Sequence, residues 1–181
     1  MSERCALLLR AVNVSGANRV PMAELRALLT SQGGLQNVST YIASGNVVCD
    51  APEDLAAACT KARKLIAGEF GVDTPVIART HAELARAEKD DPFPDAPLDK
   101  MVHAMFLESG AAVGAVEQLS ARLQPGERVA LVGRELWIDY GPGGVASTKL
   151  TRAVLDRALG TPGTGRNRNT VRRLVQLTAP A

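Results

Sequence analysis

Two short stretches of the sequence are rich in side chains that bind oxyanions. They are Asn13 to Arg19 (NVSGANR) and Thr164 to Thr170 (TGRNRNT). Arginine forms paired hydrogen bonds to phosphate or carboxylate, and a polar loop entering a helix offers unpaired N–H groups to an anion. With a Ser-Gly-Asn turn and two flanking residues, they give the predicted ligand-binding residues Arg10, Asn13, Asn18, Arg19, Tyr41, Ser44, Asn46, Arg166, Asn167 and Asn169.

The same residue types also have a purely structural explanation. Asparagine, serine and glycine are common in loops because they fit turn geometry, and a partly buried arginine often holds carbonyls or a carboxylate. Turn geometry is the stronger of the two explanations. The sequence contains no phosphate-binding G-x-x-x-x-G-K-[ST] loop, no HExxH motif and no G-x-S-x-G motif. No cofactor and no metal site are therefore indicated.

The cysteines and a group of aspartates are the other residues that could take part in chemistry. Cys5, Cys49 and Cys59 are odd in number and widely spaced, which argues against a disulfide framework and favours small buried side chains. A nucleophilic Cys49 or Cys59 would need an imidazole from one of the two histidines. Four aspartates lie among prolines between Asp90 and Asp99, and a solvated linker explains them better than an acid–base pair or a metal site.

Composition indicates a globular protein with two compact units. The chain has 181 residues, of which 46% are hydrophobic and 22% charged, and its formal net charge is +2. Residues 146–181 have seven basic residues and one acidic residue, whereas residues 51–145 have fifteen acidic and ten basic. This asymmetry favours either an anionic partner or a charge match within the protein. No signal peptide or membrane span is recognisable, so a cytoplasmic location is expected.

Hydrophobic periodicity predicts the order strand, helix, strand, strand, helix, strand in the first half. This is the split βαβ order of a ferredoxin-like α+β domain. In the first half we expect a buried strand at 5–12, a helix from Pro21 to Gly33, a hairpin at 38–49, a helix at 54–67, a strand at 74–79 and then a short helix from a Thr80–Glu83 capping box.

The second half repeats this order of elements without a residue-level repeat. Strands are expected at 101–107, 128–132 and 135–140, and helices at 112–123, 147–159 and, as a closing element, 169–177. A final edge strand is the alternative to the closing helix, and the stretch from Gly160 is interpreted as turns. The predicted domains are 1–92 and 100–181, joined by a proline-rich linker at 93–99.

Several linked motifs resemble one bacterial family, the domain of unknown function 1697 (DUF1697). They are LLRAVNVSGANRVPMAEL (Leu8 to Leu25), TYIASGNVV (Thr40 to Val48), DPF (Asp91 to Phe93) and RNRNTV (Arg166 to Val171). The resemblance implies two ferredoxin-like domains and no established activity. Ala11 and Ser15 replace glycines of the family pattern, and Arg168 replaces its tryptophan.

Three hypotheses follow for function. The first is a binding module for a phosphate-bearing or other anionic ligand, nucleic acid included, although six aromatic residues are few for a module that stacks bases. The second is a small enzyme acting on an anionic metabolite between the domains, with Arg10 and Arg166 as oxyanion clamps and Tyr41 or His103 as acid or base. The third is an interaction scaffold whose polar motifs only lock the packing. We favour the first.

Overall fold

The computed structural model describes residues 3–180 and divides into two compact units. The first unit runs to Ala85 and includes the chain again from Leu174, and the second is Arg86–Arg173. The expected domain ranges were 1–92 and 100–181, so the units differ from them mainly in where the last helix is divided. None of the helices within residues 3–180 has the length and apolar composition needed to cross a bilayer.

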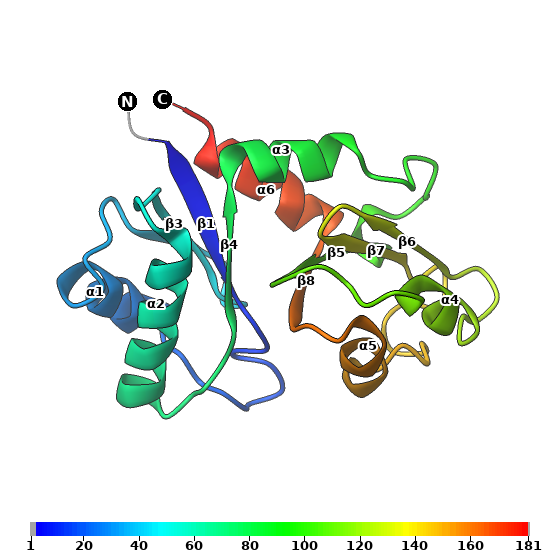
Figure 1. Ribbon diagram of the computed structural model, residues 1–181, viewed down its shortest axis with the longest axis horizontal. Helices are drawn as coiled ribbons and strands as arrows, with labels where there is room; N and C mark the ends of the chain where they lie inside the picture. The colour runs from blue at the N-terminus through cyan, green and yellow to red at the C-terminus, as the bar shows by residue number, and fades with distance from the viewer. Residues whose placement is uncertain (1–2, 181) are drawn as a thin grey trace. The chain divides into compact units, whose positions relative to one another are not determined.

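The first unit is a four-stranded antiparallel sheet in the order β2-β3-β1-β4 (Figure 1). Its two long helices, α1 and α2, lie on one side of the sheet (Figure 1). The elements are β1 (Arg4–Leu9), α1 (Met22–Ser31), β2 (Ser39–Tyr41), β3 (Asn46–Asp50), α2 (Leu55–Phe70), β4 (Val76–Thr80) and α3 (His81–Lys89).

The apolar run of β1 explains its inner position in the sheet. Residues 5–9 are 0% exposed, because one face of the strand packs against the helices while the other face is also covered. Leu7 and Leu9 belong to the core that α1 and α2 complete with Leu25, Leu29 and Ile66. The expectation of a strand buried on both faces is confirmed for residues 5–9, whereas the strand expected to reach residue 12 ends at Leu9.

Helix ends in this unit follow the signals in the sequence. The Asp54 side chain accepts a hydrogen bond from the Ala57 N–H and begins α2, and Gly71 ends it with a left-handed φ of 67°. The expected capping box is present at the start of α3. The Thr80 N–H donates to Glu83 Oε2 over 2.9 Å, and the Glu83 N–H donates to Thr80 Oγ1 over 3.2 Å.

The second unit has the same strand arrangement, β6-β7-β5-β8, and every pair of neighbouring strands is antiparallel. Both units therefore have the ferredoxin-like α+β fold. Helices α4 and α5 supply the core with Leu119, Leu155 and Leu159. The elements are η1 (Asp99–Met101), β5 (Val102–Leu107), α4 (Ala115–Ser120), β6 (Arg128–Val132), β7 (Glu135–Asp139), α5 (Arg152–Leu159), β8 (Gly163–Asn167) and the start of α6 (Arg168–Thr178).

The stretch from Gly160 differs from its expected structure. Residues 163–167 were interpreted as turns, but they form β8, which pairs with β5 along its whole length. Gly163 allows close packing here. A Cβ added to Gly163 would lie 2.8 Å from the Met105 Cγ and 2.9 Å from the Leu107 Cδ2. The closing helix is confirmed, and the edge strand precedes it instead of replacing it.

Two helices of the second unit are shorter than expected. α4 begins at Ala115 because Gly114, with φ 79°, interrupts the expected helix from Ala112. α5 begins at Arg152 because the Thr151 hydroxyl accepts from the Val154 N–H and caps it there.

Candidate functional site

The loop between β1 and α1 uses its asparagines to close a tight turn. Asn13 donates from Nδ2 to the carbonyls of Val20 and Ala43, both over 2.8 Å, and its Oδ1 accepts from the Val20 N–H over 2.8 Å. Asn18 donates from Nδ2 to the Ala11 carbonyl over 3.0 Å. Both hydrogens of the Asn13 amide are thereby occupied within the first unit, which leaves this side chain with little capacity for a ligand.

The Ser-Gly-Asn turn lies beside this loop and is also closed internally. Asn46 is 0% exposed and donates from Nδ2 to the Tyr41 carbonyl over 2.9 Å and to the Ser44 hydroxyl over 3.2 Å. Gly45 has φ 85°, and a Cβ there would lie 2.7 Å from both Leu9 Cβ and Val12 Cγ2. The bond from Asn13 to Ala43 joins the two turns. The structure therefore brings together the asparagines of the Asn13–Arg19 loop and of the Ser-Gly-Asn turn. Their hydrogen bonds hold the two turns in place.

The remaining predicted residues of the first unit lie around these turns. Arg10 and Tyr41 are half-buried, at the ends of β1 and β2, and Arg19 is exposed. The Arg10 carbonyl accepts from the Thr74 hydroxyl over 2.5 Å, which ties the loop to the start of β4. A role of these residues in ligand binding stays a prediction.

The motif at Thr164 to Thr170 belongs to the second unit. It forms the end of β8 and the start of α6, where a helix-entry loop was expected. Arg166 is 6% exposed on β8 and donates from Nη1 to the Thr164 hydroxyl over 2.7 Å and to the Gly165 carbonyl over 2.8 Å. Burial lowers the pKa of its guanidinium to about 10. Asn167 accepts from the Thr170 N–H over 2.9 Å and so caps α6, and Asn169 is exposed. The cap already satisfies one of the helix N–H groups expected to face an anion.

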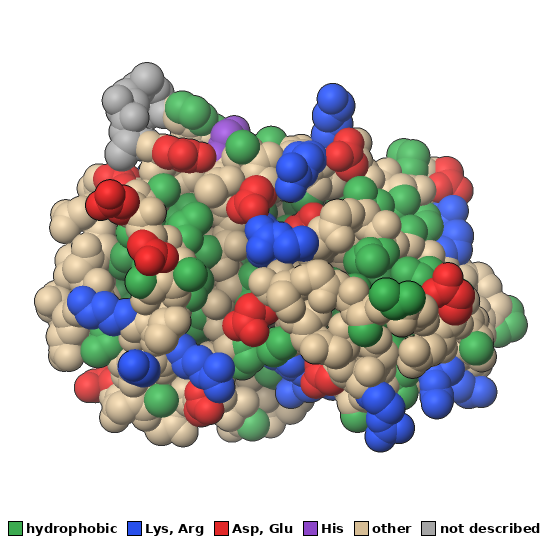
Figure 2. All heavy atoms as spheres, viewed as in Figure 1, with side chains coloured by type: hydrophobic (Ala, Val, Ile, Leu, Met, Phe, Trp, Pro, Cys, Tyr) green, Lys and Arg blue, Asp and Glu red, His purple; other side chains and the backbone are tan. Residues whose placement is uncertain are grey.

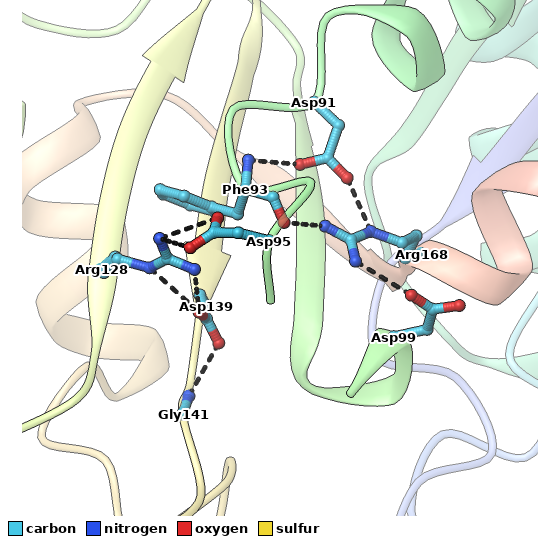
Figure 3. Close-up of polar contacts among 8 residues, drawn as sticks. All are labelled: Asp91, Phe93, Asp95, Asp99, Arg128, Asp139, Gly141 and Arg168. Atoms are coloured by element: carbon cyan, nitrogen blue, oxygen red, sulfur yellow. Dashed lines mark hydrogen bonds and ion pairs between the residues drawn. The ribbon is translucent and has the colours of Figure 1, made fainter. Parts of the chain in front are cut away.

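Arg168 is the centre of a network that the sequence reasoning missed (Figure 3). Its guanidinium donates to Asp91 Oδ2 over 2.6 Å, to Asp99 Oδ1 over 2.9 Å and to the Phe93 carbonyl over 2.5 Å. The Arg168 side chain is 5% exposed and that of Asp91 is 11% exposed. The D-P-F motif and the late R-N-x-N motif are therefore joined through this one side chain. We call Arg168, Asp91, Asp99 and Phe93 the Arg168 clamp.

A second arginine holds the other end of the same segment. Arg128 donates from Nε and Nη2 to Asp139 Oδ2 over 3.1 and 2.8 Å, and from Nη1 to both carboxylate oxygens of Asp95. Its guanidinium carbon also lies 4.6 Å from the centre of the Phe93 ring, a cation–π distance. Phe93 thus contacts Arg168 through its carbonyl and Arg128 through its ring (Figure 3).

These contacts correct the interpretation of the aspartates as a solvated linker. Asp91, Asp95 and Asp99 each accept hydrogen bonds from an arginine, and Phe93 is 6% exposed. The Arg168 hydrogen bond, with Arg172, holds the pKa of Asp99 below its usual range, and Arg128 does the same for Asp95. Residues 91–99 are therefore packed on the second unit. No spacing rule signals such pairs, since Asp91 and Arg168 are 77 residues apart.

A pocket of about 370 Å³ lies next to Arg128 in the second unit. Its wall is mainly apolar, and the Arg128–Asp139 ion pair is its charged part. Asp139 also accepts from the Gly141 N–H over 2.9 Å, so its carboxylate is fixed from two sides. The volume lies within the range of small-ligand sites. The lining residues are Pro97, Leu98, Met101, Gly126, Arg128, Asp139, Gly141 and Pro142.

The acid–base residues of the enzyme hypothesis lie in different units. Tyr41 belongs to the first unit, whereas His103, in β5 of the second, packs against Tyr140 in a T-shaped pair with the ring centroids 5.1 Å apart. Burial lowers the pKa of His103 and raises that of Tyr140 to about 12. Within residues 3–180, no three His, Cys, Asp or Glu side chains are grouped so as to hold a metal ion.

The fold and the arginine network define an α+β protein made of two ferredoxin-like units. The chain belongs to the family described as protein of unknown function (DUF1697), whose model matches residues 1–137. The sequence has no match among curated proteins. The fold is similar to that of a solved structure, the conserved bacterial protein SP0830 from Streptococcus pneumoniae, at 23% identity and a TM-score of 0.76, over 99% of this chain and 100% of that one.

The structure shows the backbone conformation and the contacts at two departures from the family pattern. Ala11 and Ser15, which stand where the pattern has glycine, both have a φ of 51°. A side chain with a Cβ is strained in this left-handed region, whereas glycine is not. Arg168, where the resemblance implied a tryptophan, lies outside the matched residues 1–137 and is the donor of the whole Arg168 clamp.

Replacing Ala11 by glycine is expected to stabilise the protein. Removing the strain of a left-handed alanine contributes about 1–2 kcal/mol, and the greater flexibility of glycine in the unfolded chain costs about 0.5–1 kcal/mol. The free energy of unfolding should therefore rise by about 0.5–1 kcal/mol. Urea unfolding measures it. The matched control is Ala27→Gly in the exposed face of α1, which should destabilise by about 1 kcal/mol. Equal destabilisation by both variants would contradict the strain at Ala11.

Removal of the Arg168 side chain is expected to destabilise the fold. Arg168→Ala leaves the Asp91 carboxylate buried without its cation, which should lower the free energy of unfolding by about 3 kcal/mol. The control, Arg172→Ala, removes an arginine that is 46% exposed and pairs with the same Asp99, and should cost less than about 1 kcal/mol. Urea unfolding of both variants tests this, and similar losses would show that burial does not set the cost.

The clamp should also make stability depend on acidity. Because the folded-state pKa of Asp99 is lowered, its contribution is complete above the ordinary aspartate pKa of about 3.9 and is lost as pH falls through the folded value. The difference in Tm between the wild type and Asp99→Asn should thus be largest above about pH 5 and shrink towards pH 3. A difference that stays constant over this range would exclude the ion pairs of Asp99 as its source.

Proposed function

We propose that this protein is a binding module for an amphipathic anion, a small molecule with one acidic group on an apolar body. The observation that carries the proposal is the pocket of about 370 Å³ whose apolar wall ends at the Arg128–Asp139 pair. A concave apolar site with few polar groups is the usual form of a small-ligand site. The acidic group would lie on Arg128, and the body would lie against Leu98, Met101 and Pro142.

The two carboxylates on Arg128 differ in how firmly they are held, and this difference supports the proposal. The Asp139 side chain is 6% exposed and fixed by two donors, so it anchors the inner edge of the guanidinium. The Asp95 side chain is 70% exposed. An exposed ion pair is worth only about 0.2–1 kcal/mol, so Asp95 can yield its place to a ligand carboxylate, phosphate or sulfonate.

Charge sets a limit on the affinity of such a site. The ligand anion exchanges one for one with Asp95, so the ion pair itself contributes little net free energy. Most of the affinity would come from burial of the apolar body, at roughly 25 cal/mol per Å². A purely polar anion such as inorganic phosphate should bind weakly for the same reason.

A nucleic-acid partner has less support than a small anion. Arg166 is buried, and Arg168 and Arg172 are paired with carboxylates, so three of the seven basic residues of 146–181 are less available to a phosphate backbone. On the face shown in Figure 2, Lys and Arg side chains are interspersed with Asp and Glu, whereas a phosphate backbone favours a continuous basic surface. The exposed residues Lys149, Arg152 and Arg157 remain as its candidate contacts.

We also propose that the protein works in the bacterial cytoplasm. Its odd number of cysteines fits a compartment in which thiols stay reduced. The similar solved structure is that of a bacterial protein.

The test compares two fluorescent probes of similar shape, 1-anilinonaphthalene-8-sulfonate and its uncharged analogue N-phenyl-1-naphthylamine. Asp95→Asn should tighten binding of the sulfonate by about two- to fivefold and leave the neutral probe unchanged, because it removes only the competing carboxylate. Arg128→Lys should weaken the sulfonate about tenfold by loss of the guanidinium fork. Leu98→Ser should weaken both probes.

The matched control is Asp73→Asn, because Asp73 is also an exposed aspartate (67%) paired with an arginine, Arg63, but in the first unit. It should change neither affinity. Near-ultraviolet circular dichroism must stay native in each variant, since partly unfolded proteins also bind the sulfonate probe. Equal binding of both probes, or no response to Asp95→Asn, would contradict the proposed site.

A further inference from the structure

Two of the three cysteines meet in the core of the first unit. Cys5 of β1 and Cys49 of β3 are direct partners in the strand register, and their sulfur atoms lie 3.7 Å apart. Both are 0% exposed and belong to the core cluster under α1 and α2. The sequence, in which they are 44 residues apart, indicated isolated thiols. The fold makes them a pair.

The backbone holds this pair at a distance that suits a disulfide. On the same two strands, the Leu9 N–H donates to the Gly45 carbonyl and the Ala51 N–H donates to the Glu3 carbonyl. Hydrogen-bonded pairs alternate along antiparallel strands, so Cys5 and Cys49 occupy one, with Cα atoms about 5.5 Å apart. A disulfide requires roughly 4.4–6.8 Å between Cα atoms. The Cα spacing thus suits a disulfide, but the Cβ atoms of a hydrogen-bonded pair lie about 5.5 Å apart and a disulfide needs about 3.5–4.5 Å. The bond therefore closes by side-chain rotation together with a small shift of the two strands.

The thiols also differ in acidity, which gives the pair one preferred nucleophile. Their mutual hydrogen bond, together with burial, raises the pKa of Cys5, whereas the same hydrogen bond lowers the pKa of Cys49. The thiolate is the reactive form of cysteine, so the attack is assigned to Cys49, although either sulfur can donate in their shared hydrogen bond. Cys59 of α2 is half-buried and packs on the same core, so the third thiol is the competing partner that a test must remove.

We propose that Cys5 and Cys49 form an oxidisable dithiol site that reacts with low-molecular-weight disulfides. The Cys49 thiolate attacks one sulfur of the external disulfide, forms a mixed disulfide and releases one thiolate. The Cys5 thiol then loses its proton and attacks the Cys49 sulfur, which forms the Cys5–Cys49 bond and releases the second thiolate. The external disulfide is reduced to two thiols, and the protein loses two electrons and two protons.

Burial controls the rate of this reaction, which should be slower than at an exposed cysteine pair. With both sulfurs 0% exposed, the external disulfide reaches Cys49 only when the first unit opens locally. Oxidation should thus be slow, over minutes to hours, and reversible by a dithiol reductant. Once formed, the bond closes a long loop and should raise Tm by several degrees.

The experiment uses the full chain with Cys59→Ser, incubated under native conditions with glutathione disulfide, quenched in acid and alkylated after unfolding. We expect loss of both alkylation sites, a mass lower by two hydrogens, and a cross-linked pair of peptides containing Cys5 and Cys49. Adding Cys5→Ala or Cys49→Ala should abolish the cross-link. Circular dichroism after oxidation must match that of the reduced protein.

Three outcomes would overturn the proposal. They are two thiols that stay alkylatable after prolonged exposure, a glutathione adduct on Cys49 that never closes to the intrachain bond, and a cross-link that appears only when the protein is unfolded. The site lies in the first unit and the pocket in the second, so the probe-binding variants leave this result unaffected.

Discussion

The conformation of residues 91–99 depends on the guanidinium of Arg168. This side chain satisfies the Asp91 carboxylate and the Phe93 carbonyl at once, and a buried arginine with these partners cannot move without leaving a charge unpaired. Phe93 then presents its ring to Arg128, which in turn holds Asp139. The wall of the pocket, from Pro97 to Met101, continues directly from this segment. The candidate site is thus built from contacts between segments far apart in the sequence.

Local patterns predicted most of the fold. The apolar run of β1, the helix from residue 54 and the Thr80–Glu83 capping box all depend on residues close together in the sequence, and each is present in the structure. The order of elements then implied the ferredoxin-like fold of both units. β8 was missed because its glycines signal turns by propensity, although here Gly163 lets the strand approach Met105 and Leu107 closely.

The candidate site was much less predictable than the fold. Asparagine amides bind a ligand or close a turn with the same atoms, and only the contacts of Asn13 and Asn46 show that they close turns. Likewise, a cluster of aspartates and prolines looks like a linker until the arginines that pair with it are known. Asp91 and Arg168, or Cys5 and Cys49, become neighbours only through tertiary structure, so no spacing in the sequence indicates them.

The distribution of charge argues against reading the basic C-terminal segment as an exposed binding arm. Two of its arginines, the buried Arg168 and the half-exposed Arg172, pair with aspartates from the acidic middle of the chain, which reduces the basic surplus of the segment. Such pairing costs desolvation and adds little net stability, but it specifies which segment packs where. The guanidinium best placed for a ligand is then Arg128, because its outer partner, Asp95, is exposed while its inner partner is fixed. Selectivity for an anion would depend on that asymmetry, and affinity on the apolar wall beside it.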